Sequence, residues 1–305
     1  MQNRQESGEP PWTILRILRW TTSHFRSRHI ENPRASAEIL LAHALGIRRI
    51  DLYLRHDQPL MPEERERFRE LIRRRLRHEP VAYIVGRRGF WTLELSLSPA
   101  VLIPRPETEC LVEAALECLP RNPENRILDL GTGSGAIILS LAAERPENRF
   151  YASDRSPAAL EIAKANAAGN GLEGKIHFFC GDWFAPLCPE IPGFDLIVSN
   201  PPYIRSAEIR DLQPEISFEP KAALDGGPDG LAEIRQIVGQ ARNYLAADGF
   251  LIMEIGCDQA GEVVRMAEKC GAYDQIRCTA DYSARDRVVQ MRRKAEKRLA
   301  HCEAI

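Results

Sequence analysis

Features that mark membrane and secreted proteins are missing from this 305-residue sequence. No run approaches the ~18 uninterrupted apolar residues that a membrane-spanning helix needs, so no membrane span is expected. Residues 1–10 are polar and lack the apolar stretch of a secretory signal peptide. These two absences predict a cytoplasmic protein with no membrane partner.

Cysteine and histidine are present, but without a metal-binding pattern. The eight cysteines form no C-x-x-C motif, and no histidine pair has the spacing of metal ligands. A zinc site is therefore not expected, and the predicted set of metal ligands is empty. The simplest interpretation is a set of reduced, mostly buried thiols. The cysteines are Cys110, Cys118, Cys180, Cys188, Cys257, Cys270, Cys278 and Cys302.

Lysine is absent from residues 1–80, which hold sixteen arginines and eleven acidic residues, a net charge of +5. Residues 81–305 have a net charge of −7, and the whole chain has −2. A chain so close to neutral is no general polyanion binder, so direct contact with nucleic acid is not expected. Arginine favours bidentate pairing with carboxylate or phosphate. The N-terminal part is therefore predicted to be a docking surface for a macromolecule, with an ordinary solvated helix surface as the alternative.

Hydrophobic periodicity divides the chain into segments. Residues 1–80 show helical periodicity, which predicts a small all-α bundle. Residues 81–103, including 83–86, alternate as strands do and predict a β-hairpin linker. Residues 104–292 alternate strands and helices, and the charged tail at 293–305 is expected to fray. The helices expected in the bundle are 12–26, 34–45 with Asn32 as its N-cap, 48–56, and a long charged one from Pro62.

The alternation after residue 104 indicates an α/β fold, a Rossmann-like domain with a mostly parallel, seven-stranded sheet and helices on both faces. A monomer is expected. The predicted strands are 126–130, 149–153, 176–179, 194–198, 249–255, 275–279 and 286–291, and the predicted helices are 110–118, 136–144, 157–168, 231–245 and 258–270.

A glycine-rich loop, DLGTGSG at residues 129–135, lies between the first strand and its helix. Glycines there let the backbone pass close to a ligand and turn tightly into the helix. The pattern is neither G-x-G-x-x-G nor a P-loop, which favours a nucleoside with a small zwitterionic tail over a pyrophosphate. Asp154 lies at the end of the next strand, where its carboxylate can accept both ribose hydroxyls. Asp129 can orient the loop or face the ligand's ammonium group.

Asp182 and Trp183 end the third strand, where an adenine ring would lie. The indole can stack on the ring, and the carboxylate can meet its exocyclic amine. Each acid alone is explained by a helix cap or a turn, but acids at three successive strand ends favour a nucleoside site. The predicted cofactor-binding residues are Gly131, Thr132, Gly133, Ser134, Gly135, Asp154, Asp182, Trp183 and Asn200.

The stretch Ser199-Asn200-Pro201-Pro202-Tyr203 follows the buried strand at 194–198. Each proline restricts the residue before it, so Asn200 and Pro201 are held extended. A fixed amide, an adjacent carbonyl and a ring suit a planar –NH2 group, because the two oxygens accept its hydrogens while the ring packs on its face. Pro-Pro-Tyr alone is explained by a turn. With Asn200 and the glycine loop, the stretch predicts a substrate site, with Asn200, Pro201 and Tyr203 as catalytic residues and Pro202 as a further contact.

The segment Ile103-Pro104-Arg105-Pro106-Glu107-Thr108-Glu109 leads into the helix at 110–118. Thr108 is placed to cap that helix, and acids suit its first turn. Alternatively, the segment closes one side of the cofactor site, with Arg105 or Glu107 near a charged end of the ligand. The sequence leaves both interpretations open.

Taken together, DLGTGSG, Asp154, Asp182-Trp183-Phe184 and SNPPY resemble a class I S-adenosylmethionine-dependent methyltransferase. With GFWTLELSLSPAVLIPRPETE and FEPKAALDGGPDGL (218–231), the chain resembles the PrmC/HemK family, the glutamine N5-methyltransferases of class-1 peptide chain release factors. The match extends from about residue 80 to about residue 291, and the N-terminal helical part has the family's size. The N-terminal part carries no matching motif, so docking there rests on analogy.

The resemblance implies S-adenosylmethionine as methyl donor, S-adenosylhomocysteine as product and a class-1 release factor as substrate. It implies that residues 131–135, Asp154, Trp183 and Asn200 line the cofactor site, and that residues 200–203 hold the glutamine of the Gly-Gly-Gln loop. Two alternatives stay open. An amino methyltransferase for adenine or cytosine would use the same Asn-Pro-Pro-Tyr stretch on a flipped base, and a non-catalytic adaptor would keep only the fold.

Overall fold

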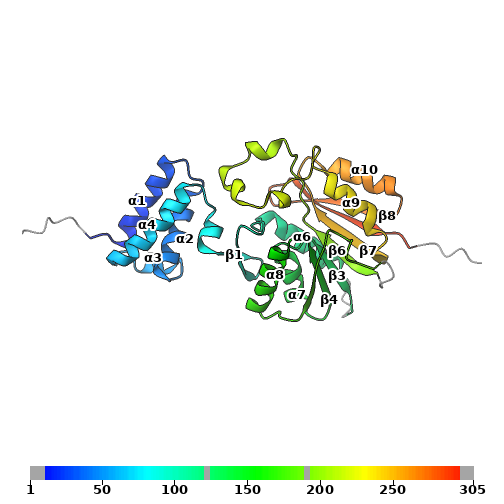
Figure 1. Ribbon diagram of the computed structural model, residues 1–305, viewed down its shortest axis with the longest axis horizontal. Helices are drawn as coiled ribbons and strands as arrows, with labels where there is room; N and C mark the ends of the chain where they lie inside the picture. Colours follow the sequence, from blue (N-terminus) through cyan, green and yellow to red (C-terminus); the bar gives the residue numbers. More distant parts are fainter. Residues whose placement is uncertain (1–10, 120–123, 189–192, 296–305) are drawn as a thin grey trace, which may run out of the picture. The chain divides into compact units, whose positions relative to one another are not determined.

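The computed structural model describes residues 11–119, 124–188 and 193–295. The chain divides into two compact units, the first ending at Gly86 and the second beginning at Arg87 (Figure 1). Each unit encloses its own core of buried apolar side chains. The predicted charged tail beyond residue 295, with Cys302, lies outside the described residues.

The first unit is all-α in its described residues, as the periodicity predicted. Fully buried side chains such as Phe25, Leu40, Leu41 and Phe68 come from three helices and meet in one core. Asn32 differs from expectation, because its side chain makes no cap hydrogen bond and its backbone is left-handed, with φ of 48°. The helices are α1 (Ile14–Ser27), α2 (Pro33–Leu45), α3 (Asp51–Leu54), α4 (Pro62–Leu76) and α5 (Val81–Val85).

The strand expected at 83–86 is wrong, because this stretch forms most of α5. Pro80 begins the helix, and Gly86, with φ of 75°, ends it. Tyr83 and Ile84 are buried, and Ile84 belongs to the core of the first unit. Tertiary packing thus overrides the strand preference of β-branched residues.

The second unit contains a sheet whose seven strands, within the described residues, run in the order β5-β4-β3-β6-β7-β9-β8. β9 is antiparallel to both of its neighbours, and the other pairings are parallel. The predicted fold class is therefore confirmed. The strands are β3 (Arg126–Leu130), β4 (Arg149–Asp154), β5 (Ile176–Cys180), β6 (Phe194–Ser199), β7 (Leu245–Glu254), β8 (Tyr273–Ala280) and β9 (Asp286–Arg293).

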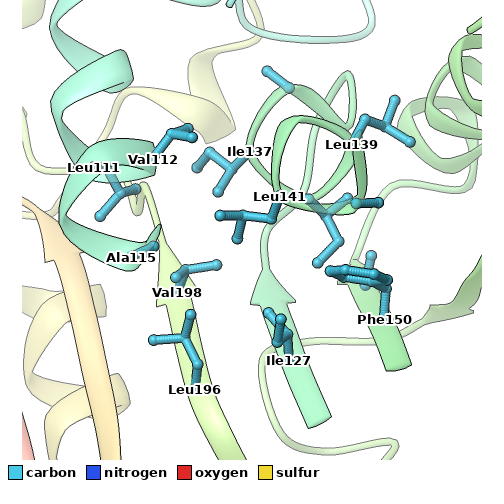
Figure 2. Packing of buried hydrophobic residues seen from close by; sticks show 14 of the residues in the cluster. Leu111, Val112, Ala115, Ile127, Ile137, Leu139, Leu141, Phe150, Leu196 and Val198 are labelled. Atoms are coloured by element: carbon cyan, nitrogen blue, oxygen red, sulfur yellow. The ribbon is translucent and has the colours of Figure 1, made fainter. Parts of the chain in front are cut away.

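Helices cover both faces of this sheet (Figure 1). Figure 2 shows how side chains of α6 and α7 pack on Ile127, Phe150, Leu196 and Val198 of the strands beneath them. Alternate residues such as Leu128 belong to a second core cluster, which includes buried side chains of α9 and α10. The helices are α6 (Glu109–Cys118), α7 (Ala136–Glu144), α8 (Pro157–Gly169), α9 (Ala232–Ala241) and α10 (Ala260–Cys270).

The strand order reverses direction between β3 and β6, which are hydrogen-bonded neighbours. From β3 the chain proceeds outward to β4 and β5, and it then returns to β6 on the other side of β3. In open α/β sheets, ligands bind outside the carboxyl ends of the strands at such a switch point. The glycine loop follows β3 and the Asn-Pro-Pro-Tyr stretch follows β6, so the fold places both predicted motifs there.

A short hairpin, β1 (Arg87–Phe90) with β2 (Leu93–Ser96), opens the second unit. Asn166 of α8 holds it, because its side chain accepts from the Ser96 amide at 2.7 Å and donates to the Ser96 carbonyl at 3.1 Å. The same side chain donates to the carbonyl of Ser134 in the glycine loop at 2.8 Å. The hairpin is thus fastened to the ligand-binding edge of the sheet.

The thiols depart from the prediction, because only Cys110 is buried among the described cysteines. Cys180, Cys188, Cys257 and Cys278 are exposed, and the described cysteines are free. Mostly buried thiols were expected from the residue type alone. Cys180 instead ends β5, Cys278 lies on the edge strand β8, and Cys188 and Cys257 lie in loops. Among the described residues, no helix is long and apolar enough to cross a membrane.

Candidate functional site

A cavity of about 230 Å³ opens at the carboxyl ends of β3, β4 and β6. Its walls combine the glycine loop and Asp154 with two segments that are distant in sequence, 100–104 and 220–223. Eight of the nine residues in the predicted cofactor set line it: Gly131, Thr132, Gly133, Ser134, Asp154, Asp182, Trp183 and Asn200.

 Gly135 is thus the one member that does not line the cavity, because it forms the N-cap of α7 behind the loop.

Backbone hydrogen bonds fix the loop against Asp154. The amides of Gly131 and Thr132 both donate to the Ser153 carbonyl at 2.9 Å. The Gly133 amide donates to Asp154 Oδ2 at 2.9 Å, and the Ser156 amide donates to Asp154 Oδ1 at 2.8 Å. Each carboxylate oxygen accepts one of these bonds and retains a further lone pair. Asp154 can therefore hold the loop and still accept ligand hydroxyls.

Gly135 must be glycine for two reasons. Its φ of 84° lies in the left-handed region, which other residues adopt only with strain. A Cβ there would lie 2.9 Å from Leu139 Cδ1, within the first turn of α7. The glycine thus allows the sharp turn from the loop into the helix.

Asp129 is fully buried and does not line the cavity. Its Oδ2 accepts from the Thr132 hydroxyl at 2.6 Å, and its Oδ1 has no hydrogen-bond partner among the described residues. Burial raises the pKa of this carboxyl to about 7, and the nearby Asp154 charge adds to the shift. Of its two predicted roles, orienting the loop agrees with this position.

Trp183 lies under the glycine loop. The indole is only 7% exposed, and its Nε1 donates to Glu233 Oε2 at 2.6 Å. A Cβ on Gly131 would lie 3.2 Å from the indole ring, so the loop passes directly against it. The ring can meet a ligand only through the small part that faces the cavity. The sequence analysis missed Glu233, which lies 50 residues away on α9.

Asn200 lines this cavity and also a second one of about 140 Å³. Its Nδ2 donates to Thr108 Oγ1 at 3.3 Å, which directs the amide and leaves Oδ1 available as an acceptor. Within the described part of the chain, no hydrogen bond ends on the Pro201 carbonyl. Thr108 occupies the N-cap position of α6, but its side chain makes no cap hydrogen bond there. Its hydroxyl instead orients Asn200.

The second cavity is lined by Asn200, Pro201 and Tyr203 together with Arg105 and Glu254. The Tyr203 hydroxyl donates to Glu254 Oε1 at 3.0 Å. Burial, followed by the charge of Glu254, raises the pKa of Tyr203, so the phenol stays protonated. Asn200 therefore lies in the wall that the two cavities share.

Arg105 forms an ion pair with Glu219. Its Nη2 pairs with Glu219 Oε1 at 2.5 Å, and the Ile103 amide donates to Glu219 Oε2 at 3.1 Å. Arg105 lines only the second cavity and Glu107 lines neither, so the expectation that one of them meets a charged end of the cofactor finds no support here. Glu219 joins two motifs that are 116 residues apart, a pairing that local sequence patterns do not reveal.

The residues that line the first cavity fit a methyl donor that carries a nucleoside. Asp154 offers a carboxylate with free lone pairs, and the loop at Gly131 and Gly133 lets the backbone approach a ligand closely. The lining residues include no lysine. Among the described residues, no cluster of three or more His, Cys, Asp or Glu side chains could hold a metal ion.

Two family descriptions match the chain. "PrmC N-terminal domain" matches residues 16–86, and "Methyltransferase small domain" matches residues 111–228. The release factor glutamine methyltransferase of Rhodopirellula baltica is 40% identical over 294 residues, which cover 95% of this chain and 99% of that protein. The Escherichia coli protein of the same name is 44% identical over 258 residues, covering 85% and 91%.

Solved structures of lower identity share the fold alone. A methyltransferase from Pyrococcus furiosus aligns with a TM-score of 0.50 at 15% identity, covering 67% of this chain and 90% of that one. The hMettl16 catalytic domain, solved with an RNA hairpin, aligns with a TM-score of 0.54 at 15% identity, covering 67% and 76%. With the sequence relatives, these findings confirm the resemblance seen in the motifs. The chain belongs to the release factor glutamine methyltransferase family.

Proposed function

We propose that the protein transfers a methyl group from S-adenosylmethionine to the side-chain amide nitrogen of the Gly-Gly-Gln glutamine in class-1 release factors. The observation that carries this proposal is the hydrogen bonding of the Asn200 side-chain amide. Its Nδ2 is held by Thr108 while its Oδ1 and the adjacent Pro201 carbonyl remain available, at the junction of the two cavities.

The chemistry explains why two fixed acceptors suffice. A glutamine amide nitrogen is a poor nucleophile because its lone pair is delocalised into the carbonyl group. The amide is also too weak an acid to be activated by deprotonation, so positioning and electrostatics remain. Asn200 Oδ1 and the Pro201 carbonyl would accept the two amide hydrogens and stabilise the positive charge that develops on nitrogen. Tyr203 would pack on the amide plane, and the proton would be lost after transfer.

S-adenosylmethionine would supply an electrophilic methyl group in the first cavity. Asp154 would accept its ribose hydroxyls, and Asp182 and Trp183 would border its adenine. Gly131 and Gly133 would allow the backbone to approach it. The product left in this cavity would be S-adenosylhomocysteine.

The release factor is the proposed partner, the first unit is the proposed docking domain, and the cytoplasm is the proposed compartment.

Methylation of adenine or cytosine in nucleic acid is disfavoured, because the relatives that match most of the chain are named release factor glutamine methyltransferase. A non-catalytic adaptor would have no need of the available acceptors at Asn200 and Pro201.

Labelled S-adenosylmethionine and a purified class-1 release factor test the proposal. We expect label on the wild-type release factor and none on a Gly-Gly-Gln→Gly-Gly-Ala version. Label that persists on the altered release factor would place the modification elsewhere. Transfer to DNA or RNA in a parallel reaction, without transfer to the release factor, would favour the alternative function.

A further inference from the structure

Glu254 is a buried carboxyl group at the carboxyl end of β7 that the proposed reaction does not yet use. The side chain is 1% exposed, yet it contributes to the wall of the second cavity. Burial raises its pKa, while the hydroxyls of Thr108 and Tyr203 and the charge of Arg287 oppose that shift. Burying a carboxyl group is costly unless hydrogen bonds compensate for lost hydration. This position therefore calls for an explanation.

Glu254 contacts the predicted substrate stretch directly. Its Oε1 accepts from the Tyr203 hydroxyl at 3.0 Å. Tyr203 and Asn200 belong to the same Asn-Pro-Pro-Tyr stretch, and both line the second cavity together with Glu254. Glu254 Oε2 has no hydrogen-bond partner among the described residues. The bond to Tyr203 thus joins a buried carboxyl group to a ring in the wall of the second cavity.

We propose that Glu254 is a positioning residue for methyl transfer, which holds the Tyr203 ring through its hydroxyl. The inference rests on the proposed function, and it adds a residue that fixes the ring expected to pack on the substrate amide. A small misplacement of an attacking nitrogen lowers the rate strongly, so the residue that sets the position of Tyr203 should control turnover.

The first test compares Glu254→Ala with Glu254→Gln in steady-state methylation of the release factor. Removing the acceptor should lower kcat by roughly tenfold or more, because Tyr203 loses its fixed position. The Kd for S-adenosylmethionine, measured by calorimetry, should change less than about twofold, since Glu254 lies outside the first cavity. Gln keeps an oxygen that can accept from Tyr203, so it should restore most of the lost turnover. Wild-type kcat in Glu254→Ala, or equal losses in both variants, would overturn the proposal.

Tyr273→Phe is the matched control. Tyr273 is another buried tyrosine of the second unit, and its hydroxyl donates to the Val238 carbonyl at 2.7 Å, but it lines neither cavity. The kcat of the Tyr273→Phe variant should stay at the wild-type value, whereas Tyr203→Phe should lower kcat. The Tyr203→Phe and Glu254→Ala effects should be non-additive, because both remove one hydrogen bond. Fully multiplicative losses would contradict the direct link between the two residues.

Glu254→Met is the second variant if the alanine variant does not fold, because its apolar side chain fills similar space without an acceptor. Should both fail, Tyr203→Phe breaks the same contact from the opposite side. It should lower kcat with little change in donor affinity, and unchanged turnover would overturn the proposal.

A crystal structure of the Glu254→Met variant, or of Tyr203→Phe if that variant alone folds, separates this inference from the proposed function. The ring at position 203 should be displaced or disordered in either variant. An unchanged ring position would overturn the inference whichever protein is the substrate. A displaced ring, in an enzyme that leaves the release factor unmodified, would instead show that the substrate assignment has failed.

Discussion

Asp129 links the glycine loop to the pH dependence of stability. Its folded pKa of about 7 lies above the ordinary value of 3.8, because burial and the Asp154 charge favour the neutral form. The folded protein therefore keeps a proton that the unfolded chain loses between these two values. Stability from this group is full below about pH 4 and declines as the pH rises towards 7, by up to roughly 4 kcal/mol.

Asp129→Asn should remove this decline, because an amide does not ionise. Thermal unfolding followed by circular dichroism at pH 5, 6, 7 and 8 measures the effect. We expect the Tm of the variant, relative to that of the wild type, to rise by several degrees between pH 5 and pH 7 and then to level off. Parallel Tm curves for the two proteins would show that Asp129 is already ionised in the folded state.

Asn200 and Asp154 should separate turnover from donor binding. Asn200→Ala removes an acceptor that acts on the developing charge, so kcat should fall about 10²- to 10³-fold with little change in donor affinity. Asp154→Ala removes the hydroxyl acceptor and a support of the loop, so the Kd for S-adenosylmethionine should rise about 10- to 100-fold.

Calorimetry and single-turnover rates measure the two effects separately. An Asn200→Ala protein that loses donor binding but reacts normally once saturated would refute the role given to Asn200. The reverse pattern for Asp154→Ala would refute the ribose contact.

The residues that sequence could identify are those whose role follows from a local pattern. Asp154 and Asn200 each follow a recognisable strand, so the fold alone brings them to one edge of the sheet. Glu254 and Glu219 are different, because their partners lie 51 and 114 residues away. No local pattern fixes such pairs, and the contact between Thr108 and Asn200, 92 residues apart, was not predicted for the same reason.

At the scale of elements, the junction between the glycine loop and α7 has little tolerance for change. Gly135→Ala would place a Cβ 2.9 Å from Leu139 Cδ1 at a φ of 84°. The left-handed conformation alone costs about 1–2 kcal/mol in a non-glycine residue. We expect a lower Tm and weaker binding of S-adenosylmethionine, both measured by thermal shift with and without the donor.

Gly239→Ala on α9 is the control for this prediction. Its Cβ would meet nothing within 4 Å, and the position is helical. Alanine there should stabilise the protein by about 0.5–1 kcal/mol. If Gly135→Ala were as stable as Gly239→Ala, the loop would have more freedom than its geometry indicates.

Element boundaries show where periodicity is insufficient. The predicted strand at 126–130 matches β3 because a buried parallel strand flanked by a glycine loop has a strong signal. The predicted helix at 231–245 is too long, since α9 ends at Ala241 and β7 begins at Leu245. At 83–86 the same apolar residues suit a strand or a helix, and only packing in the first unit decides between them.

At the scale of the whole molecule, the two units divide along lines that composition had indicated. The arginine-rich first 80 residues carry a net charge of +5, and the remainder carries −7. Trp20, Tyr53 and Leu54 of the first unit are 49%, 51% and 71% exposed. The residues that line the two cavities lie between positions 100 and 254, all within the second unit.

This division predicts separable functions. A protein of residues 87–305 retains both cavities and its own core, so it should bind S-adenosylmethionine with the Kd of the full chain. Its kcat/KM for the release factor should fall about 10- to 100-fold, because one of two contact surfaces is gone. Adding salt should weaken release-factor binding by the full chain more than by the shortened protein, since the missing unit carries the excess positive charge. Unchanged kcat/KM in the shortened protein would show that docking resides in the second unit alone.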